Sequence, residues 1–251
     1  EKCFFVEEEI GGKTVSICGI AKGSGMIHPN MATMLVFITS DVSISPALLK
    51  KALSSDIKNT FNMISIDGDT STNDMCCILA NKKAGNEPIT SASGEAYEAF
   101  KTALAAVTKK LCRAIAADGE GATKLLECKV SGAKDKETAK TVAKSVVCSS
   151  LTKAAMFGSD ANWGRVLCAI GYSGADVDVN KIDVWFKSNK GSILVCENGA
   201  GVDFSEEEAK EILSENEIDI LIDLKSGDAS STAWGCDLTY DYVKINGDYR
   251  T

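Results

Sequence analysis

The sequence predicts a mixed α/β fold in which helices cover the faces of β-sheets. Of the 251 residues, 45% are apolar, 25% are charged and only 3 are proline, which is the composition of a globular protein. Apolar runs of strand length alternate with segments of helical periodicity, and no internal repeat interrupts them. The length allows one large domain or two small ones, and the alternation predicts layers of helices packed on sheets.

The first expected elements are a β-hairpin and a central strand. Residues 2–10 and 13–20 are rich in strand-forming residues, and the pair Gly11-Gly12 between them favours a tight turn. A loop containing glycine and proline follows at 22–30. The run 34–39 is almost continuously apolar, so we expect it to form a buried central strand.

Capping residues and periodicity mark the helices. Ser45 and Pro46 suit the N-cap and first position of a helix that runs to about residue 59. From 93 to 117, apolar residues recur three or four positions apart and form one stripe. Ser205 precedes three glutamates, which favour a first helical turn. The other expected elements are helices at 137–151 and 163–170 and strands at 63–66, 75–80, 125–130, 182–186, 192–196, 218–224 and 233–238.

Charge and hydropathy exclude two classes of partner. The chain has 27 basic and 35 acidic residues, a net charge of −8, and an acidic surface repels the phosphate backbone of nucleic acids. No segment reads as a membrane span or a signal peptide, so we expect no membrane partner and a cytoplasmic location. The first residue is Glu1 rather than Met, which we expect of a fragment or a processed chain.

The ten cysteines do not predict a metal site. They are scattered, no two form a C-x-x-C pair, and His28 is the only histidine, whereas a zinc site needs clustered ligands. Cys148 and Cys168 lie within apolar runs, and we expect most of the cysteines to be small buried residues in a reducing cytosol.

An acidic loop at 67–74 resembles a calcium loop only in part. Oxygen-bearing side chains alternate from Asp67, but Thr72 stands where a calcium loop needs glycine, and Ile78 where it needs a bidentate glutamate. We therefore expect no metal and interpret the segment as a tight, internally hydrogen-bonded loop near Thr33.

Thr33 is a candidate nucleophile because it follows a glycine-containing loop and stands at the mouth of the apolar run. A Ser/His/Asp-type triad would have to use His28. The alternative base is the amine that Thr33 gains if the Ala32–Thr33 bond is cut, since an α-amine has a reference pKa of about 7.7–8.0. The small Ala32 leaves its carbonyl open to attack by the Thr33 hydroxyl. The local pattern also fits a β-branched strand residue with no chemical role.

Several distinctive segments follow one another along nearly the whole chain. They are KGSGMI at 22–27, PNMATML at 29–35, DGDTSTND at 67–74, DGEGATK at 118–124, GSDANWGR at 158–165 and YVKINGDYRT at 242–251. In this order they resemble the ornithine acetyltransferase family (glutamate N-acetyltransferase) of arginine biosynthesis. The resemblance implies an α/β fold with a two-sheet sandwich flanked by helices, of the self-processing N-terminal-nucleophile type, and a smaller C-terminal α/β part.

The resemblance implies ping-pong acetyl transfer. The family cuts one precursor at an Ala-Thr bond, here Ala32–Thr33, and the freed Thr33 takes acetyl from N2-acetylornithine and passes it to glutamate. The positions that match the family's substrate contacts are Lys22, Thr33, Glu120, Asn246 and Thr251. Lys22 suits a substrate carboxylate and Glu120 a substrate ammonium group. No cofactor is implied, and acetyl-CoA stays open as an alternative acetyl donor.

The resemblance also implies a division of the chain and a partner. Residues 1–32 match the end of the family's alpha chain, 33–175 the nucleophile-bearing α/β core and 176–251 the smaller C-terminal part. The family carries a longer segment before the cleavage site, which supplies the oxyanion hole. We therefore assign no oxyanion-hole residue here and expect a missing N-terminal segment or alpha chain as a partner, in a heterotetramer of two cleaved pairs.

Two other functions fit the same residues. A self-processing amidohydrolase or aminopeptidase would use the same Thr33 nucleophile and pass the acyl group to water. A binding or interaction domain would use Thr33 only as a structural residue, in which case Thr33→Ala would change neither processing nor activity.

Overall fold

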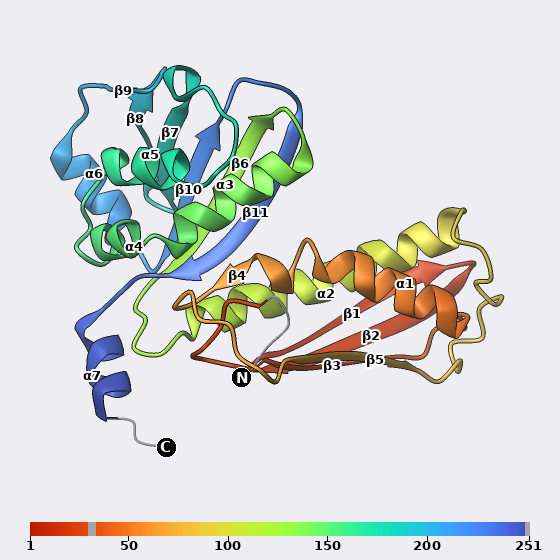
Figure 1. Cartoon of the computed structure of the whole chain (residues 1–251). Coiled ribbons are helices and arrows are strands. Elements are labelled where there is room, and N and C mark those ends of the chain that lie inside the picture. Colours follow the sequence, from red (N-terminus) through yellow and green to blue (C-terminus); the bar gives the residue numbers. More distant parts are fainter. Residues whose placement is uncertain (30–33, 249–251) are drawn as a thin grey trace. The chain divides into compact units, whose positions relative to one another are not determined.

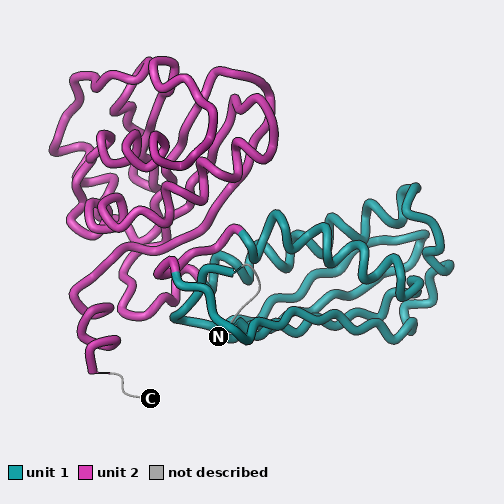
Figure 2. The backbone as a smooth tube through the Cα atoms, viewed as in Figure 1, with its two compact units in different colours: residues 1–62, 69–115 teal, residues 63–68, 116–251 magenta. Residues whose placement is uncertain are grey.

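The computed structural model describes residues 1–29 and 34–248, which form two compact units (Figure 2). Unit 1 contains residues 1–62 and 69–115, and unit 2 contains residues 63–68 and 116–251. The predicted boundary between 175 and 176 falls inside unit 2. The predicted boundary between 32 and 33 lies outside the described residues.

Unit 1 is a four-stranded mixed sheet with two helices on one face. Its strands are β1 (Cys3–Ile10), β2 (Lys13–Lys22), β3 (Leu35–Ser40) and β5 (Met75–Ala80), in the order β1-β2-β3-β5. Its helices are α1 (Pro46–Ile57), the short 3-10 turn η1 (Phe61–Met63) and α2 (Glu95–Ala117). Helices α1 and α2 lie on the same side of this sheet (Figure 1). The predicted hairpin is confirmed, with β1 and β2 paired antiparallel.

Helix α2 approaches the sheet closely because one strand residue is glycine. A Cβ atom built on Gly19 would lie 2.8 Å from both Leu111 Cδ1 and Val107 Cγ1. Both of these side chains belong to the apolar stripe of α2 and are fully buried. The predicted stripe therefore faces the sheet, and the helix start predicted at Ser45 is also confirmed, since its side chain accepts a hydrogen bond from the Leu48 N–H.

The apolar run of β3 is interior to the sheet, but the prediction that it is buried was correct for one face only. Val36 and Ile38 are fully buried beneath the helices, whereas Leu35 and Phe37 are exposed on the opposite face. An apolar sequence predicts a strand that can be covered on both faces. The described residues cover only one face of β3.

Unit 2 is a seven-stranded mixed sheet in the order β4-β11-β6-β10-β7-β8-β9. Its strands are β4 (Ile64–Ser65), β6 (Leu125–Ala133), β7 (Asp183–Ser188), β8 (Gly191–Glu197), β9 (Ala200–Gly201), β10 (Glu217–Asp223) and β11 (Ala229–Cys236). Its helices are α3 (Lys136–Cys148), α4 (Ser150–Phe157), α5 (Trp163–Gly171), the 3-10 turn η2 (Val179–Lys181), α6 (Glu206–Leu213) and α7 (Tyr240–Asp248). Helix α3 packs on β6 and β11, and α6 on β7 and β8 (Figure 1).

Two expectations for unit 2 were wrong. The single helix predicted over 137–151 is two helices, because Ser149 ends α3 and caps α4 by accepting a hydrogen bond from the Thr152 N–H. Cys148 is half-buried and Cys168 is exposed, although both lie in apolar runs, and four of the ten cysteines are buried. All ten are free thiols.

Candidate functional site

In unit 1, one group of predicted site residues lies at the entrance to β3, where two strand ends meet. Lys22, the last residue of β2, pairs with Leu35, the first residue of β3, and the Lys22 side chain is exposed. Residues 30–33 precede Met34, so the predicted cleavage residues Ala32 and Thr33 lie outside the described residues. Their assigned roles remain predictions.

The loop predicted to lie near Thr33 contacts the chain on both sides of the 30–33 segment. Thr70 Oγ1 donates a hydrogen bond to the His28 carbonyl oxygen at 2.9 Å. Asp74 accepts a hydrogen bond at Oδ1 from the Met34 N–H, and the Met75 N–H donates to the Met34 carbonyl oxygen at 2.7 Å. The segment 69–75 therefore fixes the residues that flank the candidate nucleophile.

Asp74 is the most unusual charged group in this part of the structure. Burial raises the pKa of its carboxyl, and the hydrogen bond from the Met34 N–H partly offsets that effect. Its second oxygen, Oδ2, is buried and accepts no hydrogen bond from the described residues. Carboxyl groups with perturbed pKa values are concentrated at functional sites, which makes Asp74 a candidate site residue.

In unit 2, a second group of predicted site residues connects the loop after α2 with helix α7. Asn246 Nδ2 donates hydrogen bonds to Glu120 Oε2 and to the Tyr242 carbonyl oxygen, both at 3.0 Å. The structure therefore brings together two of the predicted substrate contacts, Glu120 and Asn246, which are 126 residues apart in the sequence. Thr251 lies outside the described residues.

Backbone contacts hold the Glu120 loop against the start of α7. Gly121 has φ +68°, and a Cβ on it would lie 2.7 Å from the Tyr242 nitrogen, so a larger residue would push the helix away. Thr239 Oγ1 donates a hydrogen bond to the Gly121 carbonyl oxygen at 2.7 Å and accepts one from the Tyr242 N–H at 3.2 Å. The ring of Tyr240 also packs edge-on against Phe157, at 5.6 Å between centroids.

A buried lysine joins two of the distinctive sequence segments. Lys124 Nζ donates to the carbonyl oxygens of Met156 and Leu213, at 2.6 and 2.7 Å, and to Ser159 Oγ at 2.8 Å. Burial lowers the pKa of this ammonium group, and the Asp237 carboxylate opposes that shift. The segments at 118–124 and 158–165 therefore meet in the interior of unit 2.

Asp237 was missed by the sequence analysis. Its Oδ1 accepts hydrogen bonds from the backbone N–H groups of Thr123 and Lys124, at 2.8 and 3.0 Å, and its Oδ2 accepts from Thr123 Oγ1 at 2.5 Å. This carboxylate fixes the end of the loop that carries Glu120. The only signal in the sequence is a lone aspartate after an apolar strand, which local pattern does not distinguish from a surface residue.

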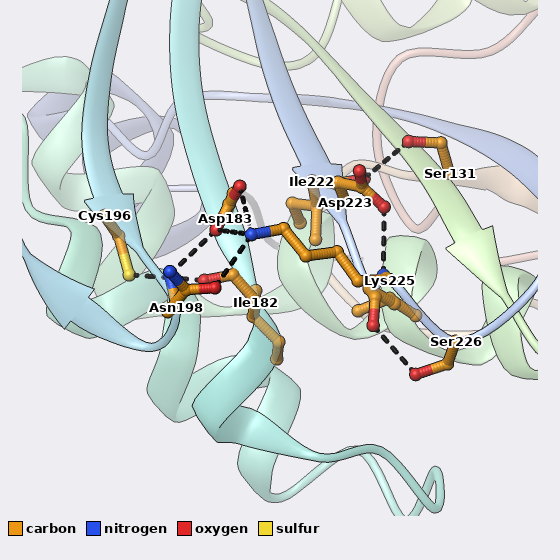
Figure 3. A network of polar contacts seen from close by, with 10 residues as sticks. Ser131, Ile182, Asp183, Cys196, Asn198, Ile222, Asp223, Lys225 and Ser226 are labelled. Atoms are coloured by element: carbon orange, nitrogen blue, oxygen red, sulfur yellow. Dashed lines mark hydrogen bonds and ion pairs between the residues drawn. The ribbon is translucent and has the colours of Figure 1, made fainter.

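A polar network at the ends of β7 and β10 contains none of the predicted site residues (Figure 3). Lys225 Nζ binds Asp183 at 2.7 Å and Asn198 Oδ1 at 2.9 Å, and the Lys225 N–H donates to Asp223 Oδ1 at 2.9 Å. The Asn198 N–H donates to Asp183 Oδ1 at 2.8 Å. Because every strong donor here has a partner within the network, we interpret it as structural.

A cavity of about 550 Å³ lies on the face of the unit 2 sheet, and Trp185, Leu221, Lys129 and Asp223 are among its lining residues. Lys22, Glu120 and Asn246 do not line it. Within the described ranges, no group of three or more His, Cys, Asp or Glu residues is arranged to hold a metal ion. Among the described residues, no helix has the length and apolarity needed to cross a membrane.

These features define a two-unit α/β protein in which mixed sheets are flanked by helices. A family model described as the ArgJ family matches residues 1–251, and the chain belongs to that family. The predicted family resemblance is confirmed.

The relatives are longer than this chain. It is 55% identical over 251 residues to "Arginine biosynthesis bifunctional protein ArgJ 1" of Clostridium acetobutylicum, covering 100% of this chain and 61% of the relative. It is 53% identical over 250 residues to "Arginine biosynthesis bifunctional protein ArgJ" of Caldanaerobacter subterraneus subsp. tengcongensis, covering 100% of this chain and 62% of the relative. The chain thus spans about three fifths of these relatives and matches their C-terminal part.

A solved structure confirms the fold class. The crystal structure of arginine biosynthesis bifunctional protein argJ from Bacillus halodurans matches with a TM-score of 0.80 and 45% identity. The match covers 85% of this chain and 98% of the solved chain. The predicted α/β fold with two sheets flanked by helices is therefore correct.

Proposed function

We propose that this chain is the nucleophile-bearing part of an acetyltransferase that moves acetyl from N2-acetylornithine to glutamate in arginine biosynthesis. Family membership supports this activity, since the named relatives are arginine biosynthesis proteins. The structural observation that carries the proposal is the clamp around residues 30–33, in which Thr70 binds His28 and Asp74 binds Met34. These contacts hold His28 and Met34, the described residues nearest to the segment on each side, and an intramolecular attack depends on well-positioned reacting groups.

In the proposed processing step, the Thr33 hydroxyl attacks the Ala32 carbonyl carbon and the acyl group moves from nitrogen to oxygen. Water then hydrolyses the ester, which leaves a carboxylate on Ala32 and a free amine on Thr33.

In the proposed reaction, the Thr33 hydroxyl attacks the acetyl carbonyl of N2-acetylornithine while its own amine takes the proton. Ornithine leaves with that proton, and the glutamate amine then attacks the acetyl ester and restores the hydroxyl. Lys22 binds a substrate carboxylate, and Glu120, held by Asn246, binds the substrate ammonium group. Thr251 is the remaining contact in this proposal.

The proposal includes an assembly and a location. The active unit is a heterotetramer of two cleaved pairs, each completed by the N-terminal segment that the relatives carry. The location is the cytoplasm, which ten free thiols favour because a reducing compartment preserves them. No resident cofactor is proposed, and acetyl-CoA is the alternative acetyl donor to be tested.

Intact mass and N-terminal sequencing of the purified chain test the processing step. Cleavage at Ala32–Thr33 gives a fragment that begins at Thr33, and Thr33→Ala prevents it. Thr33→Ser is the matched control because it keeps a hydroxyl and still cleaves. An active protein that stays joined at this bond would contradict the mechanism.

Incubation with N2-acetylornithine, with and without glutamate, tests the transfer. The acetyltransferase forms N-acetylglutamate and releases little acetate, whereas a hydrolase releases acetate whether or not glutamate is present. Labelled acetyl-CoA in place of N2-acetylornithine shows whether the second donor is used. If Thr33→Ala changed neither processing nor transfer, the binding-domain alternative would replace the proposal.

A further inference from the structure

The segment 237–239 connects β11 to helix α7 and is mostly buried. Asp237 is 3% exposed and Thr239 is 5% exposed, so both polar side chains need hydrogen-bond partners inside the protein. These partners lie in the loop 119–124, which carries Glu120, and at the start of α7, which carries Asn246. The segment therefore links the loop and the helix on which the candidate site in unit 2 depends.

The Thr239 hydroxyl group makes one hydrogen bond to each of these elements. Its oxygen accepts a bond from the Tyr242 N–H at 3.2 Å, which satisfies a donor in the first turn of α7. The hydroxyl donates its own proton at 2.7 Å to the carbonyl oxygen of Gly121, the residue directly after Glu120. Thr239 thus holds the loop against the helix, and the bond from Asn246 to Glu120 is a second link between them.

The Asp237 carboxylate holds the other end of the loop. It accepts hydrogen bonds from the backbone N–H groups of Thr123 and Lys124, and the Asp237 N–H donates to the Lys124 carbonyl oxygen at 3.2 Å. Within the loop, the Ala122 N–H donates to the Gly119 carbonyl oxygen at 2.9 Å and closes a turn. The backbone that carries the candidate carboxylate is therefore fixed by the turn itself and by the segment 237–239.

Helix α4 supports the segment 237–239 from a second direction. Lys153 is 4% exposed, and its Nζ donates a hydrogen bond to the Cys236 carbonyl oxygen. The Leu238 N–H donates to the Lys153 carbonyl oxygen at 3.3 Å. Because α4 packs on α3 and α5, these bonds tie the segment to the body of unit 2. The position of the loop 119–124 therefore follows from that of Thr239.

We propose that Thr239 is a positioning residue that makes Glu120 selective for the ammonium group of the acetyl donor. This inference rests on the proposed function, in which Glu120 binds that group. The α-nitrogen of N2-acetylornithine carries the acetyl group, so the free ammonium group is at the end of the side chain. A carboxylate held in place for this group disfavours a donor that lacks it, because the carboxylate is then left without its partner. A carboxylate on a loosened loop loses part of this preference, since binding must then order the loop.

Two acetyl donors measure this selectivity in the complete enzyme, with its N-terminal segment in place. N2-acetylnorvaline has the carbon skeleton of N2-acetylornithine and lacks the terminal amine. Thr239→Val removes both hydrogen bonds of the hydroxyl and keeps the branched shape, whereas Thr239→Ser keeps the hydroxyl. We expect Thr239→Val to lower the ratio of kcat/KM for N2-acetylornithine to kcat/KM for N2-acetylnorvaline by about tenfold or more, chiefly through a higher KM for N2-acetylornithine. Thr239→Ser should retain the ratio of the unsubstituted enzyme.

Ser205→Ala is the matched control for the loss of a helix cap. Ser205 caps α6 by accepting a hydrogen bond from the Glu208 N–H, as Thr239 does for α7, and its replacement should leave the ratio unchanged. An equal fall of the ratio in Ser205→Ala and Thr239→Val would overturn the inference, as would an unchanged ratio in Thr239→Val. If the unsubstituted enzyme transferred no acetyl from N2-acetylornithine, the proposed function would fail and this inference with it.

Discussion

The backbone N–H of Met34 donates a hydrogen bond to the Asp74 carboxylate, and Met34 directly follows the candidate nucleophile Thr33. The bond crosses from the 69–74 loop to the entrance of β3. Burial raises the pKa of the Asp74 carboxyl, the bond from the Met34 N–H opposes that shift, and Oδ2 accepts no hydrogen bond from the described residues. We therefore assign Asp74 a positioning role for the peptide that precedes Met34.

Replacement of Asp74 should slow processing. Asp74→Ala removes the acceptor for the Met34 N–H and should reduce the rate of cleavage before Thr33 by at least tenfold, since small misplacements of reacting groups have large kinetic costs. Asp74→Asn keeps a neutral acceptor oxygen, so its cleavage rate should fall less than that of Asp74→Ala. Thr72→Ala changes an exposed side chain of the same loop and should cleave at the unsubstituted rate. Intact mass measured over time gives all three rates, and equal rates for Asp74→Ala and Thr72→Ala would refute the role.

The contact between Glu120 and Asn246 predicts how α7 is held. Asn246→Asp places two carboxylates where an amide now donates at 3.0 Å, so α7 should detach more often and its amides should exchange faster. The double variant Glu120→Gln/Asn246→Asp restores an amide–carboxylate pair and should recover slow exchange. The pair is exposed, so the effect on the free energy of unfolding should stay below about 1 kcal/mol. Hydrogen exchange of residues 240–248 tests this prediction. Amide exchange in the double variant as fast as in Asn246→Asp would contradict it.

Local sequence signals predicted where most helices and strands begin. They did not predict which faces of those elements other segments cover. The starts of α1 and α6 follow from Ser45 and Ser205, whose side chains cap the helices by accepting backbone hydrogen bonds three residues on. The break at Ser149 was missed because helical periodicity continues on both sides of it. The exposure of Phe37 was missed because an apolar sequence shows only that a face can be buried. It does not show whether another segment covers that face.

The candidate site was predictable only through the family resemblance. Glu120 and Asn246 are 126 residues apart, and Thr123 and Asp237 are 114 apart, so no local pattern links either pair. The resemblance identified Glu120 and Asn246 as substrate contacts, and the structure brings their side chains together. Asp237 and Asp74 hold backbone groups, a role that depends on long-range geometry and leaves no signature in spacing.

The buried ammonium of Lys124 should contribute strongly to the stability of unit 2. Lys124→Met leaves the carbonyl oxygens of Met156 and Leu213 without their buried donor, which should cost about 2–4 kcal/mol. Lys129→Met, on the strand β6 that Lys124 directly precedes, is the control, because Lys129 is 42% exposed in its ion pair with Asp219 and its replacement should cost less than about 1 kcal/mol. Urea unfolding measures both, and a cost for Lys124→Met no greater than for Lys129→Met would contradict the prediction.

Asp56 should make unit 1 less stable as the pH rises. Burial raises the pKa of its carboxyl, against the opposing hydrogen bonds from Thr108 and Thr60. The folded state therefore holds the proton more tightly than the unfolded state does. The resulting stability is complete below the unfolded pKa of 3.8 and is lost as the pH rises through the folded pKa. Asp56→Asn removes this titration. From pH 4 to pH 7, the free energy of unfolding of the variant should therefore increase relative to that of the unsubstituted chain. A constant difference over that range would rule the prediction out.

Thiol labelling should follow the burial of the cysteines. Cys3, at the start of β1, and Cys168, on α5, are both exposed and should react first with N-ethylmaleimide. Burial, with a contribution from the Asp56 charge, raises the pKa of Cys76 to about 12, so that thiol should react at least tenfold more slowly at neutral pH. Mass spectrometry of the labelled peptides measures each rate, and equal rates for Cys76 and Cys168 would contradict the prediction.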